Sequence, residues 1–72
     1  MLKITTKWVR GKGDEQITPQ HFQNEAHYND YVKVMLKRGF VAQLMKVEDI
    51  HTGQLAKIEN NKFKFTPGGS NA

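Results

Sequence analysis

The chain begins with a regular alternation of two kinds of side chain. Within residues 2–10, the even positions before Arg10 are mainly apolar and are Leu2, Ile4, Thr6 and Trp8. The odd positions of the same segment are Lys3, Thr5, Lys7 and Val9. Because successive side chains of a strand point to opposite faces, this pattern predicts a half-buried β-strand. Gly11 and Gly13 follow and predict a turn.

The segment after this turn supports two interpretations. Residues 15–18 fit the return strand of a short hairpin. Thr18 and Pro19 also fit the start of a helix, because threonine suits the N-cap and proline suits the first helical position. Gln16 to Thr18 are therefore either strand or helix start.

A helical period follows. The apolar stripe consists of Tyr28, Tyr31, Val32, Met35 and Leu36, spaced i, i+3, i+4, i+7 and i+8. Asn24 is the expected N-cap, and Glu25 places a negative charge in the first turn. Gly39 is the expected residue after the C-cap, because glycine adopts the left-handed conformation without steric cost. We predict one helix, with Tyr28, Val32, Met35 and Leu36 packed on a sheet.

The last third of the chain predicts a meander of short strands. The expected strands are residues 40–50, 55–59 and 62–66. Alternation in the first is imperfect, which indicates a bulge or burial on both faces. Gly53 and the pair Asn60-Asn61 predict the two turns, since both residue types tolerate positive φ. Phe63 and Phe65 share one face of the last strand.

These elements predict a small α+β fold in which one helix packs on an antiparallel sheet of three to five strands. The chain order is β-(β)-α-β-β-β. Residues 1–66 are expected to form a single domain. Residues 67–72 have nothing to bury and are expected to form a flexible tail.

Composition narrows the class of protein. The 72 residues include 11 Lys and Arg against 7 Asp and Glu, for a formal charge of +4, and no cysteine. No apolar run approaches the roughly 20 residues that span a bilayer, and the start does not fit a signal peptide. We therefore expect a cytoplasmic protein with no membrane partner and no cofactor. The positive charge favours polyanionic partners.

Lysines recur on the strand faces that are expected to point away from the helix. The candidate nucleic-acid-binding residues are Lys3, Lys7, Lys57, Lys62 and Lys64. Together they would form a basic sheet face that neutralises phosphates. The simpler interpretation is that lysines commonly line solvent-facing strands and protect sheet edges from pairing. Whether the five lysines share one face depends on which face of each strand points to the core.

The alternative hypothesis is a protein-interaction module, such as an inhibitor or adaptor. Tyr28 and Tyr31 are its candidate contacts, because partly exposed tyrosines are frequent in interfaces. An open sheet edge is a second route to the same function. A domain with so small a core would also gain stability from self-association, so a homo-oligomer is a third hypothesis. Small basic chains without catalytic residues are typical of accessory proteins of phages and mobile elements.

Nothing in the chain predicts catalysis or metal binding. His21, His27 and His51 lack the spacing and partners of a zinc site. No serine precedes Ser70, and no cysteine nucleophile exists. The adjacent carboxylates, Asp14/Glu15 and Glu48/Asp49, would point to opposite faces of a strand. We expect a protein that is not an enzyme.

Overall fold

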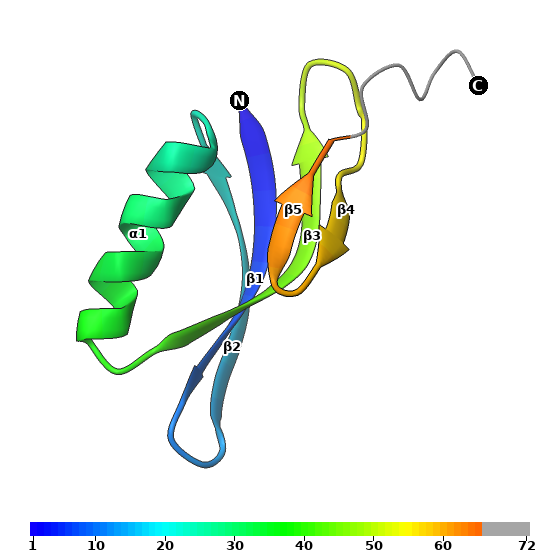
Figure 1. Ribbon diagram of the computed structural model, residues 1–72. Coiled ribbons are helices and arrows are strands. Elements are labelled where there is room, and N and C mark those ends of the chain that lie inside the picture. Colours follow the sequence, from blue (N-terminus) through cyan, green and yellow to red (C-terminus); the bar gives the residue numbers. More distant parts are fainter. Residues whose placement is uncertain (66–72) are drawn as a thin grey trace.

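The computed structural model describes residues 1–65, which form one helix and five strands (Figure 1). The strands are β1 (Leu2–Arg10), β2 (Asp14–Phe22), β3 (Val41–Asp49), β4 (Lys57–Glu59) and β5 (Lys62–Lys64), and the helix is α1 (Glu25–Lys37). The α+β fold class predicted from the sequence is confirmed. Thr66 and the predicted tail lie outside the described residues. Within residues 1–65, no helix is long and apolar enough to cross a membrane.

The main sheet has the order β2-β1-β3 and is antiparallel throughout. The segment that the sequence left open is part of β2, because Gln16 pairs with Trp8 and Thr18 pairs with Thr6. Pro19 lies inside β2. An edge strand tolerates proline, since the missing N–H can face away from the neighbouring strand. The N-terminal hairpin is therefore longer than predicted.

The helix ends as the sequence predicts. The Oδ1 atom of Asn24 accepts a hydrogen bond from the backbone N–H of His27 at 2.9 Å. At the other end, Gly39 has φ 89° and its N–H donates to the carbonyl of Leu36. The N–H of Phe40 donates to the carbonyl of Met35, which completes a Schellman motif. Helix α1 therefore reverses directly into β3.

The core lies between the main sheet and the helix. The first four even positions of β1 are buried, as the alternation predicts, and they are Leu2, Ile4, Thr6 and Trp8. Helix α1 contributes Tyr28, with Tyr31 and Val32 partly buried beside it. The prediction that Leu36 belongs to the packed stripe is wrong, because Leu36 is 58% exposed. It lies in the last turn of α1, directly after the partly buried Met35.

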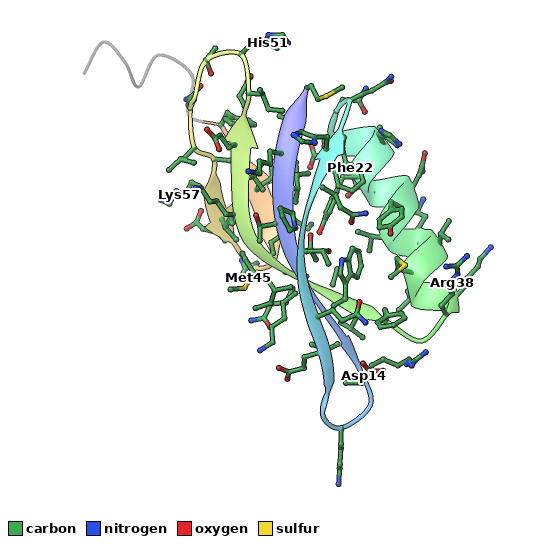
Figure 2. All side chains as sticks on the ribbon, turned by 180° about the vertical axis from the view of Figure 1, so that it is seen from behind. Asp14, Phe22, Arg38, Met45, His51 and Lys57 are labelled. Atoms are coloured by element: carbon green, nitrogen blue, oxygen red, sulfur yellow. The ribbon has the colours of Figure 1, made fainter. Side chains whose placement is uncertain are left out.

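The expected meander is interrupted after β3. A backbone bridge joins Glu48 to Leu55, but β4 and β5 form a separate two-stranded sheet, the C-terminal hairpin. Ile58 and Phe63 pack against the core cluster, so this hairpin folds over the same face of the main sheet as α1. Figure 2 shows the result from behind, with the helix and the hairpin both on the far side of the sheet. No helix or strand of residues 1–65 covers the other face of the main sheet, which we call the open face (Figure 2).

Two local features shape β3. Lys46 pairs with Thr5 and Leu44 pairs with Thr6, so Met45 is the extra residue of a β-bulge. The bulge predicted from the imperfect alternation is confirmed. Asn61 then attaches the C-terminal hairpin to β3. Its Oδ1 accepts from the N–H of Leu44 and its Nδ2 donates to the carbonyl of Ala42, each at 2.8 Å.

Candidate functional site

The structure divides the five candidate lysines between two faces. Lys3 and Lys7 alternate with buried residues of β1 and lie on the open face of the main sheet. Lys57, Lys62 and Lys64 lie on the outward side of the C-terminal hairpin, because Ile58 and Phe63 of the same strands face the core. The hairpin and the open face are on opposite sides of the main sheet (Figure 2). The five lysines therefore do not form one patch.

On the open face, positive charges are interspersed with carboxylates. Lys7 forms an ion pair with Glu15, with Nζ and Oε1 3.3 Å apart. Lys3 lies directly opposite Glu48 in the register. Lys46, which the sequence did not single out, lies beside the bulge and is exposed. The carboxylates of Glu15 and Glu48 lower the local positive charge and weaken the attraction of this face for phosphate.

The outward side of the C-terminal hairpin, which we call the hairpin face, carries a denser set of charges. Lys57 and Lys64 lie directly opposite each other across the two strands, and Glu59 lies opposite Lys62. The carboxylate of Glu59 is also 3.8 Å from the ammonium group of Lys57. All four side chains are exposed. Three cations and one anion therefore lie on a surface only two short strands wide.

A groove of about 410 Å³ lies along this hairpin. Its lining consists of the four charged residues of the hairpin face, together with Phe63 and with Glu25 from the first turn of α1. The groove lining therefore includes three lysines and two carboxylates beside Phe63, whose ring packs toward the core. Sequence reasoning missed Glu25, Glu59 and Phe63 as groove residues. The order of charges along 57–64 was visible in the sequence, but the approach of Glu25 depends on the tertiary fold.

The ring of Phe63 is held in place by aromatic neighbours. Its centroid lies 6.2 Å from that of Tyr28 and 6.3 Å from that of Phe65, and both pairs are edge-to-face. Such contacts fix the orientation of a ring beyond what simple burial does. One side of Phe63 contacts the core, while the residue also lines the groove.

The two candidate tyrosines are largely structural. Tyr28 is 3% exposed, as its place in the packed stripe predicts, so it is not the partly exposed contact that the protein-interaction hypothesis needs. It shares a hydrogen bond with the hydroxyl of Thr6 at 3.1 Å. Burial raises the pKa of the Tyr28 hydroxyl, and this hydrogen bond opposes the rise. Tyr31 is partly buried, and its ring packs edge-to-face on Trp8 at 5.6 Å. The sequence placed them on one stripe, but their depth depends on how the helix is rotated.

The three histidines lie in three different elements of the fold. His27 accepts a hydrogen bond at Nδ1 from the N–H of Gln23 and packs edge-to-face on Phe22. His21 lies opposite Lys3 on the main sheet, and His51 lies in the loop after β3. In the part of the chain that the structure describes, no group of three or more His, Cys, Asp or Glu residues is arranged to hold a metal ion.

Arg10 is engaged within the fold. Its guanidinium lies 2.8 Å from the carboxylate of Asp14 and its carbon Cζ is 4.8 Å from the centre of the Phe40 ring. The first contact joins the end of β1 to the start of β2, and the second joins it to the segment between α1 and β3. Arg10 therefore offers less to an external anion than the exposed lysines of the hairpin face.

In comparisons with known proteins, no family model, no curated protein and no solved structure matches the chain. The function is therefore inferred from the chemistry of the two faces.

Proposed function

We propose that this protein is a non-enzymatic binding module and that its hairpin face contacts the phosphates of a nucleic acid. The observation that carries the proposal is the placement of Lys57 and Lys64 directly opposite each other, with Lys62 on the same face. Like charges in directly opposed strand positions are destabilising. A bound phosphate chain would neutralise this repulsion. Because the free protein is destabilised by the repulsion and the complex is not, binding of a polyanion is favoured.

The proposal restricts the interface to three of the five candidate lysines. Lys57, Lys62 and Lys64 share the hairpin face and would each neutralise a phosphate, whereas Lys3 and Lys7 lie on the opposite side of the main sheet. Three neutralised phosphates of a single strand predict a slope of about −2 for log affinity against log salt concentration. Affinity should then fall roughly 20-fold between 50 and 200 mM salt.

The test is the fluorescence anisotropy of labelled oligonucleotides at these salt concentrations, with charge reversals as variants. Lys62→Glu/Lys64→Glu should abolish measurable binding and flatten the salt dependence, because two phosphate contacts become repulsive. Lys12→Glu/Lys33→Glu is the matched control, since it changes the net charge equally at exposed positions outside the groove lining. Equal losses in both variants would show that only the net charge matters. No binding by the unmodified protein at low salt would contradict the proposal.

A second candidate function is protein recognition by the open face of the main sheet. Ile17 and Val41 are each 58% exposed, and Met45 is 48% exposed. Val41 lies directly opposite Val9. Ile17 lies opposite Lys7, which is the next residue of β1 on the same face. Apolar side chains grouped on an uncovered sheet face are a feature of interaction surfaces. This observation supports an adaptor or inhibitor role at a site distinct from the groove.

A further inference from the structure

We infer that the outer edge of β2 takes an extended segment of a partner protein, which joins the main sheet as a fourth strand. The site consists of the outward backbone groups of residues 15–17 and the exposed side chain of Ile17 beside them. It lies at the opposite edge of the main sheet from the C-terminal hairpin, which is attached to β3. The inference therefore goes beyond the proposed function and does not depend on it.

The hydrogen bonds of the sheet show which backbone groups of β2 point outward. The N–H of Leu44 donates to Asn61, so it points away from β1. Leu44 lies opposite Thr6, whose own N–H and C=O then point to β2, where Thr18 is the partner. Successive residues of a strand direct these groups to opposite sides, so Ile17 directs its N–H and C=O away from the sheet.

The two edges of the main sheet differ in how their outward groups are bonded. On β3, these groups bond to Asn61 and to Ala56, whose N–H donates to the carbonyl of Val47. On β2, no hydrogen bond from within residues 1–65 reaches the outward backbone groups of Glu15 or Ile17. An unpaired strand edge pairs readily with an extended chain, because the same N–H and C=O groups form the ladder with any strand. The main sheet can therefore grow at β2.

The available part of this edge is short. Helix α1 packs beside the Phe22 end of β2, whereas Asp14 lies at the other end, near the loop after β1 (Figure 2). Gln16 is exposed although it lies on the helix side of the sheet, so this end of β2 extends beyond the helix. Pro19 faces outward like Ile17 but has no N–H, so a continuous ladder is limited to residues 14–18.

The side chains of β2 indicate the chemistry of the partner segment. Strand β2 contains two carboxylates and no lysine or arginine, whereas each of the other four strands carries at least one lysine. Lysines protect edge strands from pairing with other chains, and β2 lacks this protection. Glu15 is paired with Lys7, yet its side chain remains 51% exposed. A strand that places a basic residue beside Glu15 and an apolar residue beside Ile17 would complement this edge.

A second copy of this chain fits the same edge poorly. An antiparallel pair of β2 strands that joins residues 14–18 and keeps Pro19 out of the ladder places the two Glu15 side chains opposite or diagonal to each other. Like charges in such positions are destabilising. The other registers place Pro19 opposite an outward-facing residue and lose two hydrogen bonds. The occupant is therefore a segment of a different protein.

The test uses a capped six-residue peptide that alternates valine and threonine over four positions and ends in two lysines. In the antiparallel direction, it places a valine beside Ile17 and a lysine beside Glu15. In hydrogen exchange followed by nuclear magnetic resonance, saturating peptide should slow exchange of the Ile17 amide at least about fivefold. The amides of Gln16 and Thr18 are already bonded to β1 and should change little.

Two matched peptides separate the backbone from the side chains. A peptide that is N-methylated at the valine beside Ile17 and the lysine beside Glu15 keeps its side chains but cannot form the ladder, so it should not bind. A peptide with two glutamates in place of the lysines should bind at least about fivefold more weakly at low salt. Equal binding of the N-methylated peptide would overturn the inference, because only side chains would then be recognised.

Ile17→Pro tests the edge from the side of the protein. It removes the outward N–H and leaves the ladder between β1 and β2 intact, as Pro19 already does in the same strand. Peptide binding should weaken at least about tenfold, whereas the matched control Ile17→Val should bind within about twofold of the unmodified protein. Circular dichroism shows whether the variant folds, and the N-methylated peptide gives the same test on the unmodified protein. If millimolar peptide does not slow exchange at the Ile17 amide, or if the free protein already pairs as a dimer through β2, the inference is wrong.

Discussion

At the scale of single residues, the buried pair Tyr28 and Thr6 connects the helix to the centre of the main sheet. Both residues are almost fully buried, and their hydroxyl oxygens are 3.1 Å apart. In Tyr28→Phe, the Thr6 hydroxyl would remain buried without this partner, which costs about 1–3 kcal/mol of unfolding free energy. Adding Thr6→Val should recover part of this loss, because both polar groups are then removed together. Strict additivity of the two substitutions in urea unfolding would contradict this coupling.

The raised pKa of Tyr28 predicts how stability depends on pH. Burial disfavours the phenolate, so the pKa in the folded protein lies above the value of 10.0 in the unfolded chain. The stability that the protonated Tyr28 hydroxyl contributes is therefore fully present below about pH 10. It is lost as pH rises through the pKa of the folded protein, because the unfolded chain releases this proton at lower pH. The difference in unfolding free energy between the unmodified protein and Tyr28→Phe should shrink above pH 10. A difference that stays constant up to pH 11 would show that Tyr28 titrates normally.

At the scale of elements, the side chain of Asn61 adds two hydrogen bonds that hold the C-terminal hairpin to β3. Asn60 and Asn61 have φ of 52° and 62°, so both occupy the left-handed region of a two-residue turn. Only the Asn61 side chain also bonds Leu44 and Ala42. Asn61→Gly keeps the turn and removes both bonds, which should cost about 1–3 kcal/mol and speed hydrogen exchange at the Leu44 amide. Asn60→Gly is the matched control and should change stability little.

The elements differ in how far the sequence could predict them. Strand β1 and the ends of α1 follow from local patterns, since alternation buries Ile4 and Asn24 and Gly39 cap the helix. The turn at Asn60 and Asn61 was predictable for the same reason. The separation of β4 from β3 was not, because it is part of a tertiary arrangement in which Phe63 contacts the distant Tyr28. Local patterns contain no information about such a contact between distant segments.

At the scale of the whole molecule, this limit explains why the predicted lysine face is divided. The sequence predicted correctly which face of each strand points to the core. Lys3 of β1 and Lys64 of β5 both lie on the face that points away from it. The sequence does not show that the hairpin folds over the helix side of the main sheet and so turns its outward face away from Lys3. The groove with Glu25 arises from the same fold, which is why its residues could not be assembled from spacing alone.

The open face of the main sheet gives the last prediction, which concerns the state of the molecule in solution. Three strands of nine residues present a face of about 400 Å², well below the roughly 800 Å² that each partner contributes to a standard interface. A second copy on this face alone would therefore bury too little for a stable dimer. We expect a monomer whose unfolding temperature does not depend on protein concentration, and Ile17→Thr/Val41→Thr should change unfolding free energy by less than about 0.5 kcal/mol. An unfolding temperature that rises with concentration, and no longer does so in this variant, would instead show that a second copy covers the face.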